Sequence, residues 1–427
     1  MIWNADSSQA RETAPGQVPG ARAIAAVAGL AFALFSFATV EALPVGLLPQ
    51  IADSLEVSVP SVGLLVTGYG FVVMATAVPL TTATRRVPRR RLLAVLLTIF
   101  TAATLICGTA PGYGVLMGAR ILIALTHAVL WSVVASAAAG MFPERQQAKV
   151  VALLFGGSAM AQVAGAPAGT WLGQATDWRV PFVAMSGLGL VAAVVVVGML
   201  PSSPVEENPA ATALEPSRVR FALVVTATAL VVGGFFTFYT YVTVFLTDVS
   251  GMPSRSLGAV FAVGGLGGLV GTSLSGMLSA RSTRGTMTGS VAVMTASLGL
   301  LVTAGTRPAA SVTAVTLSLT ALSAMVTALT TRILRIAPGN VDVAAAGSSA
   351  AFQAGLAVGS FLGGWVLEDH GPRGAALLGT LLVAAGLILL LAEEPLCRPV
   401  RGRGRGGIPP APYSEAPPPD NSTSRAG

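Results

Sequence analysis

Two ionisable side chains lie inside long apolar segments, where charge is costly and usually serves a function. Of the 18 acidic residues, only Glu41 falls within an expected membrane span, and of the 25 basic residues only Arg120 lies well inside one, because Lys149 is at the very start of its span. Each costs about 2.5–3.5 kcal/mol at the centre of a bilayer. A carboxylate beside an arginine in such a place is suited to load and release a proton. We therefore take Glu41 and Arg120 as the candidate proton-coupling pair, with a fixed structural ion pair as the alternative.

The spacing of the residues places further candidates beside this pair. Glu41 lies about seven residues before the outer end of its span, and Arg120 about seven after the outer end of its own. At 1.5 Å per residue both are roughly 10 Å below the outer surface. His127 and Trp131 follow Arg120 at +7 and +11, on the same helix face. This face is expected to line a central cavity, where His127 and Trp131 contact the transported molecule.

The composition identifies an integral membrane protein. The 427 residues are 53% hydrophobic and 10% charged, with a mean hydropathy of +0.75, whereas a soluble domain carries about 25% charged residues. Cys107 and Cys397 cannot form a disulfide framework, and the two histidines are far apart in sequence. The single lysine, Lys149, follows an alanine, so there is no phosphate-binding loop. We expect no enzyme activity, metal or cofactor.

Breaking the chain at proline, glycine and charge clusters predicts an all-α protein with twelve spans. Each is long enough to cross the hydrocarbon core, which takes roughly 20 apolar residues. The predicted spans are 23–48, 62–83, 92–110, 113–141, 148–172, 180–200, 221–246, 257–279, 286–304, 309–331, 343–366 and 374–392. They form two six-helix bundles, 23–200 and 221–392.

The remaining segments are polar. Residues 1–22 are expected to form a cytoplasmic tail, 201–220 a cytoplasmic linker, and 393–427 a disordered cytoplasmic tail. With both termini inside, the inner segments hold 20 basic residues and the outer loops 4, which predicts this orientation. The net charge of +7 then faces anionic membrane lipids. No nucleic-acid partner is expected.

A stripe of small residues occurs once in each half. Ala161, Gly165, Gly169 and Gly173 recur every four positions, and the same pattern returns 190 residues later. Its members there are Ala351, Gly355, Gly359 and Gly363. Small residues at this spacing let helices approach closely in a membrane. A duplicated six-helix unit is typical of a transporter that works by alternating access, with its site between the two lobes.

At these residues the chain resembles the major facilitator superfamily, in particular its twelve-helix proton antiporters. The stretch from Glu41 to Ala52 is similar to the first helix of that group, and Arg120 matches its fourth-helix arginine. Gly165-Ala-Pro167-Ala-Gly169 is similar to the fifth-helix antiporter signature. The resemblance implies that Gly165, Pro167, Gly169 and Gly173 form a close-packed hinge. It also implies a monomer in a bacterial plasma membrane.

The segment Thr126-His-Ala-Val-Leu-Trp-Ser132 is most similar to the sugar-efflux (arabinose exporter) branch of the superfamily. Sugar recognition needs side chains that pair with hydroxyl groups, because an unpaired buried polar group costs about 1–3 kcal/mol. The candidates are His127, Gln162, Tyr239, Tyr241 and Gln353. Drug recognition needs aromatic walls instead, which Phe37, Trp131, Phe235 and Phe236 can supply.

The sequence therefore predicts an exporter that exchanges sugars or sugar-like molecules for protons. A multidrug or chloramphenicol-type drug:proton antiporter remains open as an alternative. A facilitator without proton coupling and a ligand-binding membrane sensor are further alternatives of the same architecture.

Overall fold

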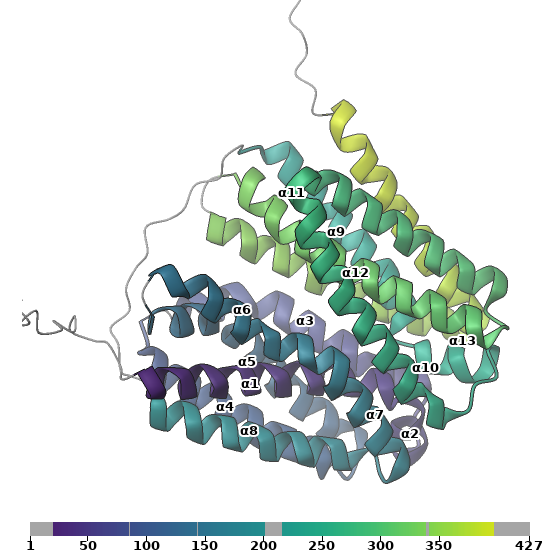
Figure 1. The fold of residues 1–427 in the computed structure, drawn as a ribbon. Coiled ribbons are helices and arrows are strands. Elements are labelled where there is room, and N and C mark those ends of the chain that lie inside the picture. Colours follow the sequence, from purple (N-terminus) through teal and green to yellow (C-terminus); the bar gives the residue numbers. More distant parts are fainter. Residues whose placement is uncertain (1–19, 85, 143, 201–215, 339–340, 397–427) are drawn as a thin grey trace, which may run out of the picture.

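The computed structural model describes residues 20–84, 86–142, 144–200, 216–338 and 341–396. Within these ranges every regular element is helical (Figure 1). Ten of the helices are long and apolar enough to cross a membrane, and two of those, of 51 and 50 residues, are long enough to cross twice. The described residues therefore make twelve crossings, as the sequence predicted.

The first half consists of six crossings built from helices α1 to α8. These are α1 (Gly20–Gly46), α2 (Leu48–Ser54), α3 (Val59–Thr84), α4 (Arg89–Gly108), α5 (Tyr113–Ala139), α6 (Glu144–Met160), the π-helix η1 (Ala161–Gly165), α7 (Ala166–Ala175) and α8 (Arg179–Met199). The expected span 148–172 comprises α6, η1 and α7. The Ala166 N–H donates to the Ala161 carbonyl, five residues back. Pro167 lacks an N–H, which favours such an irregular turn.

The second half also makes six crossings. Its elements are α9 (Arg218–Tyr239), α10 (Val242–Val244), the π-helix η2 (Phe245–Val249), the short η3 (Ser254–Ser256), α11 (Leu257–Ala304), α12 (Pro308–Ile336) and α13 (Val341–Leu396). Two of the helices contain a sharp bend, α11 at Ser282 and α13 at Gly371. Gly371 has a φ of 68°, a left-handed conformation that glycine adopts without a Cβ penalty.

Several element ends differ from the prediction. The expected span 221–246 is interrupted, because α9 ends at Tyr239 and a turn follows before α10. The buried Tyr241 side chain lies at this turn, between glycines of α3 and α13. The last helix continues to Leu396, beyond the expected end at 392, and α9 begins within the expected linker. Most of the linker and the terminal tails lie outside the described residues.

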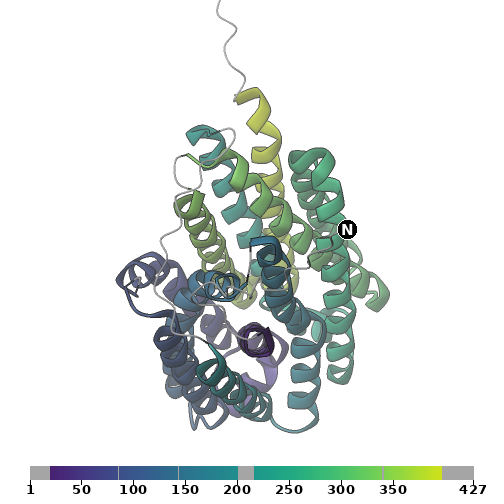
Figure 2. The same cartoon turned by 60° about the vertical axis from the view of Figure 1, so that its left-hand side comes forward.

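Each half has its own hydrophobic core. One core is built almost wholly from α1 to α8 and the other from α9 to α13. In Figure 1 the two groups of helices lie below and above one another, converging at the end that holds α2, α7 and α10. Figure 2 shows α1, the darkest helix, nearly end-on among the other helices of its half. Tyr241 and Val244 join the first core, and Val45 and Val66 join the second.

The glycine stripes pack against matching helices in the two halves. In the first half Gly165, Gly169 and Gly173 lie against Thr39 and Leu43 of α1 and Leu47, which directly follows α1. In the second half Gly355, Gly359 and Gly363 lie against Ala229, Gly233 and Thr237 of α9. Each of these partners is also offset by 190 residues from its counterpart. The sequence repeat is therefore a repeat of helix packing, fifth helix on first helix in each half.

In each half, an arginine on the third membrane crossing donates to a main-chain carbonyl near the end of the sixth crossing. Arg90 donates to the Val197 carbonyl at 3.0 and 2.6 Å, and Arg284 donates to the Leu391 carbonyl at 3.4 Å. Among the described residues, an acidic side chain takes part in this contact only in the second half. There Glu393 forms ion pairs with Arg332 and Arg284. Glu393 is 3% exposed. This carboxylate therefore joins α11, next to its bend at Ser282, to the ends of α12 and α13.

Replacing Glu393 with glutamine is expected to destabilise the second half. Both arginines would lose the charge that compensates them, and breaking a buried ion pair costs about 3–5 kcal/mol. We expect the low end of this range, because the Arg284 side chain is 31% exposed. Thermal unfolding in detergent measures the loss. Asp177→Asn is the control, since its pair with Arg179 is half-exposed and should change stability by less than about 1 kcal/mol.

Candidate functional site

The acidic side chain of the first span lies against a histidine. Glu41 is on α1, and its Oε2 atom is 3.7 Å from Nδ1 of His127 on α5. The Glu41 side chain is 28% exposed, whereas His127 is 7% exposed. A carboxyl group that is mostly enclosed but still reachable can exchange a proton with water while its charge is poorly solvated. This geometry suits a proton-binding group.

The same histidine nitrogen has a second partner that sequence reasoning missed. The Tyr69 hydroxyl on α3 is 2.7 Å from His127 Nδ1, and the Tyr69 ring is buried. A buried phenol usually finds a hydrogen-bond partner, so a tyrosine within an expected span was the available signal. Side chains from three helices of the first half thus meet at one nitrogen of the imidazole ring.

Arg120 lies close to Glu41 but does not pair with it directly. Its Nη1 atom donates to the Val40 carbonyl at 2.8 Å, and its guanidinium stands 4.6 Å from the centre of the Tyr69 ring. Among the described residues there is no ion pair between Arg120 and Glu41. Arg120 bonds to the main chain of the residue just before Glu41. It therefore influences the Glu41 carboxylate through its electric field and not through a direct ion pair. The Nε and Nη2 atoms are buried without a partner in the described residues.

Aromatic rings enclose the histidine. Trp131 lies 5.4 Å from the His127 ring centre and stacks on Phe155 of α6 at 5.6 Å. Phe37 meets the imidazole edge-on at 6.4 Å. Trp131 and His127 thus share one face of α5, as the spacing predicted, and Trp131 remains partly exposed. These rings restrict how His127 can turn.

A second aromatic group lies in the other half. Tyr239 stacks on Phe235 at 4.8 Å and meets Phe236 and Phe261 edge-on. Phe236 also approaches Phe352 of α13 at 6.4 Å. Tyr239, Phe236 and Phe352 are all partly exposed. They offer flat apolar surfaces, and the Tyr239 hydroxyl is the polar group among them.

Tyr241 has a different position from the one we expected. It is 2% exposed, and its hydroxyl donates to the Ser360 carbonyl at 3.0 Å. Its ring contacts Gly63 of the first half and Gly364 of the second. The nearby Thr243 hydroxyl donates to the Val45 carbonyl at 3.3 Å. Tyr241 therefore joins the two halves in this structure, and its hydroxyl is bound to the main chain.

Loss of the Tyr241 hydroxyl should affect stability and leave cargo affinity alone. Tyr241→Phe removes one buried hydrogen bond, worth about 0.5–1.5 kcal/mol, and keeps the packing of the ring. We expect a lower unfolding temperature and an unchanged dissociation constant for cargo. A large loss of affinity in this variant would return Tyr241 to the binding site.

The two glutamines lie where the halves touch. The main chain at Gln162, in η1, packs on Gly265 of α11, and the Gln353 carbonyl on α13 faces Gly70 of α3. The Gln162 side chain is exposed, whereas Gln353 is buried and its Oε1 atom has no partner in the described residues. Their main chains thus each contact a helix of the other half. Gln353 has one unsatisfied acceptor for a hydroxyl group.

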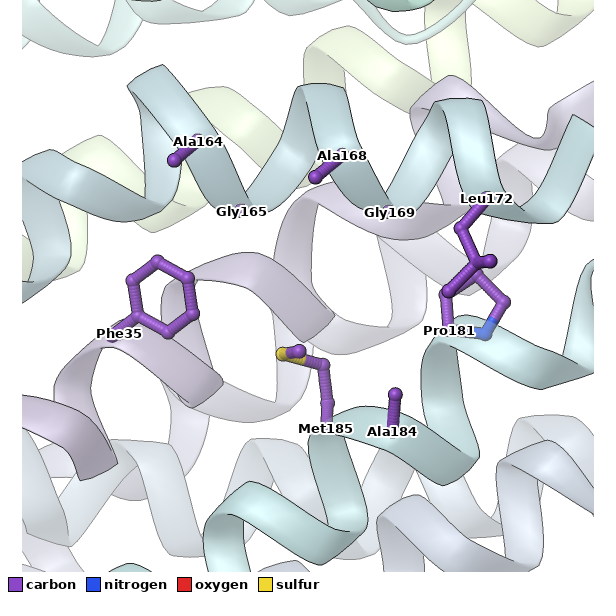
Figure 3. A pocket seen from close by; sticks show the side chains of 9 residues that line it. All are labelled: Phe35, Ala164, Gly165, Ala168, Gly169, Leu172, Pro181, Ala184 and Met185. Atoms are coloured by element: carbon purple, nitrogen blue, oxygen red, sulfur yellow. The ribbon is translucent and has the colours of Figure 1, made fainter.

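Two of the four expected hinge residues line an apolar hollow. Gly165 and Gly169 line it with Phe35, Leu172 and Met185, between α1, α7 and α8 (Figure 3). Phe35 and Met185 project into it from different helices in this view. All nine lining residues are apolar, so this hollow offers no hydroxyl partners and is separate from the Glu41–His127 cluster. Pro167 and Gly173 are buried beside it on α7.

The chain matches the Major Facilitator Superfamily over residues 30–348. It is 32% identical over 376 residues to an uncharacterized MFS-type transporter, YtbD, of Bacillus subtilis, covering 86% of this chain and 94% of the relative. It is 31% identical over 362 residues to a probable sugar efflux transporter of Mannheimia succiniciproducens, covering 84% and 91%. Inner membrane transport protein YdhP of Escherichia coli K12 is 33% identical over 368 residues, covering 85% and 93%.

Solved structures have the same fold. A bacterial homolog of the human lysosomal transporter Spinster, in an inward-facing and unoccupied conformation, aligns with a TM-score of 0.63 at 15% identity, covering 88% of this chain and 96% of that one. The human organic anion transporter MFSD10 aligns with a TM-score of 0.64 at 12% identity, covering 87% and 100%. At these identities the likeness concerns the fold alone.

Proposed function

The chain belongs to the Major Facilitator Superfamily, and we propose that it is a secondary active transporter that exports sugars or sugar-like molecules in exchange for protons. Its family and its transporter relatives identify a multi-pass membrane transporter rather than an enzyme. The relative described as a probable sugar efflux transporter supports sugar as the cargo. Alternating access of two six-helix bundles is the mode of transport that this fold provides.

The Glu41–His127 contact is the observation that carries the proton coupling. Glu41 is partly exposed and lies beside the buried His127, which Tyr69 contacts, and Arg120 contacts the neighbouring Val40. A proton taken up from outside neutralises the carboxyl group, and its release inside restores the negative charge beside Arg120. Because that charge is poorly solvated, each proton state favours a different arrangement of the surrounding helices. Cargo moves in the opposite direction during the return.

The energy of one proton is sufficient for useful export. One charge that crosses 100 mV releases about 2.3 kcal/mol, and a tenfold concentration gradient costs about 1.4 kcal/mol. One inward proton can thus sustain roughly a fifty-fold outward gradient of a neutral solute.

The proposed location is a bacterial plasma membrane, with both termini cytoplasmic. Support comes from the basic residues, 20 in the inner segments and 4 in the outer loops. In this orientation the end that holds α2 and α10 faces outward, and the basic segments face anionic lipid headgroups. We also propose that the transporter works as a monomer.

A drug:proton antiporter is the second candidate. The observation in its favour is the pair of aromatic groups, Trp131 with Phe155 in one half and Phe236 with Tyr239 in the other. Aromatic walls suit apolar or amphipathic molecules. Sugars also stack on aromatic rings, but they require more hydrogen-bond partners. The candidate partners are Gln353, Tyr239 and Gln162.

Uphill transport separates these proposals from a passive facilitator. Inside-out vesicles with an acidic interior are given a radiolabelled pentose or thiogalactoside, and in parallel a labelled amphenicol drug. We expect accumulation of the sugar well above its outside concentration, collapsing to equilibration when an ionophore dissipates the pH gradient. Accumulation of the drug alone would favour the second candidate. Equilibration without accumulation of either would contradict proton coupling.

A further inference from the structure

Three polar side chains from three helices converge on a single atom. His127 Nδ1 on α5 is 2.7 Å from the Tyr69 hydroxyl on α3 and 3.7 Å from Glu41 Oε2 on α1. Tyr69 is 1% exposed and His127 7%. The shorter contact is a hydrogen bond, and the longer is within reach of a small shift in the Glu41 side chain.

The protonation of the imidazole decides what this contact can do. A neutral histidine donates through one ring nitrogen and accepts through the other. Tyr69 is buried, so its hydroxyl needs a hydrogen-bond partner, and that partner is Nδ1 of His127. When the phenol donates to Nδ1, the ring hydrogen must be on Nε2. The partner of one ring nitrogen thus sets the tautomer.

We propose that Tyr69 is a positioning residue that donates to Nδ1 of neutral His127 and so holds the ring in the Nε2–H tautomer, with Nδ1 as the proton acceptor nearest Glu41. His127 is then the group that accepts the proton from Glu41, and Arg120 acts on both through its field. This inference rests on the proposed coupling role of Glu41. It adds a second proton-bearing group and a residue that orients it.

The proton transfer balances within these three side chains. The protonated Glu41 carboxyl gives its hydrogen to Nδ1 and becomes a carboxylate, while His127 becomes an imidazolium with both nitrogens protonated. For this transfer the Tyr69 hydroxyl first turns its hydrogen away from Nδ1, which frees the lone pair, and its oxygen then accepts from the new Nδ1–H. No electrons are exchanged, and the positive charge that forms on His127 is paired with the new negative charge on Glu41.

The surroundings keep the ring in place for this exchange. The centres of the Trp131 and Phe37 rings lie 5.4 and 6.4 Å from the centre of the imidazole. The groups with charge or protons that act on the cluster are Glu41 from α1, Tyr69 from α3 and Arg120 from α5. Arg120 stands over the Tyr69 ring at 4.6 Å and fixes it from another direction.

The tautomer can be observed directly because the chain contains only two histidines, His127 and His370. Replacing the exposed His370 with glutamine leaves a single imidazole signal in the full-length protein. With ring-15N histidine in lipid nanodiscs, we expect the Nε2–H tautomer at neutral pH. Tyr69→Phe should return the ring to a mixture that includes Nδ1–H. An Nδ1–H ring in the unaltered cluster, or a tautomer that does not respond to Tyr69→Phe, would overturn the proposal.

A transport measurement tests whether the orientation matters. Tyr69→Phe should shift the pH of half-maximal proton-driven export by about half to one pH unit. The matched control is Tyr113→Phe, which loses a hydroxyl hydrogen bond of 2.6 Å to the Ser61 carbonyl, away from the cluster. The control should keep the original pH profile. Equal profiles for both variants would reduce Tyr69 to a structural residue.

The two readouts separate this inference from the proposed function. If Glu41→Gln still exports uphill, the coupling proposal fails, whereas the tautomer of His127 remains a property of the structure that NMR reports. If coupling depends on Glu41 but the tautomer is wrong, only the role of Tyr69 fails.

Discussion

Export driven by a proton gradient stops when Glu41 is replaced by glutamine, while cargo binding remains within about threefold of its original strength. Glutamine keeps the size and the hydrogen-bonding ability of the side chain beside His127, so the local packing survives. It cannot gain or lose a proton, and therefore no transition between proton states is available to drive the cycle. Labelled-sugar accumulation in acid-interior vesicles measures the loss, and binding to the purified variant measures what is kept.

The same substitution elsewhere shows that the effect is specific. Glu368 is exposed on α13 near the bend at Gly371, and Glu368→Gln should transport normally. Full uphill export by Glu41→Gln would remove Glu41 from the mechanism. Loss of both export and binding would indicate that the carboxylate belongs to the cargo site instead.

The second large effect is expected at a glycine in the repeat. A methyl group added at Gly359 would overlap the main chain of α9 at Gly233, including its carbonyl oxygen. A main-chain atom cannot move aside unless α9 and α13 separate. We expect Gly359→Ala to lower the free energy of unfolding by about 1–3 kcal/mol. Without this overlap, replacing glycine by alanine would stabilise the helix by up to about 1 kcal/mol.

Two further glycines provide the comparison. At Gly169, the counterpart in the first half, the added methyl group meets the end of the Leu43 side chain, which can rotate. Gly169→Ala should therefore cost less than Gly359→Ala. At Gly187 on α8 no atom lies within 4 Å of the new methyl group, so that variant should be neutral or stabilised. Equal stability of all three would contradict the close packing of α9 and α13.

The helices were predictable because apolar length is a strong signal in a membrane protein. The spans end within a few residues of the observed helices, since the charges at Arg89, Arg179 and Arg218 mark the ends. The interruption at Tyr241 was not predictable. The segment around it is as apolar as a continuous span, and the contact of Tyr241 with glycines of two other helices at the break has no signal in the sequence.

The repeat was visible in the sequence, but its partners were not. Small residues every four positions indicate a close helix contact without saying which helix is on the other side. The structure supplies α1 and α9, and their contacting residues have the same 190-residue offset as the stripes themselves. The sequence thus contained both sides of the interface, and only one side had a recognisable pattern.

The sequence predicted that Glu41 and Arg120 lie at a similar depth, but it did not predict which groups their side chains contact. Equal distances from the helix ends correctly brought Glu41 and Arg120 to the same region. The choice of partner depends on side-chain direction within about 2 Å, which helix counting cannot resolve. Arg120 therefore meets the Val40 carbonyl, and Glu41 meets His127. Tyr69 carried no spacing signal, because its helix contains no other residue of the cluster.

The most direct test of the central claim records protons rather than cargo. Inside-out vesicles with an acidic interior are loaded with a pH-sensitive dye, and pentoses, thiogalactosides and amphenicol drugs are added in turn. We predict that a sugar restores the dye signal, because each exported molecule is exchanged for a proton, and that Glu41→Gln vesicles show no recovery. Absence of recovery with every compound, in vesicles that still equilibrate one of them, would contradict proton-coupled export.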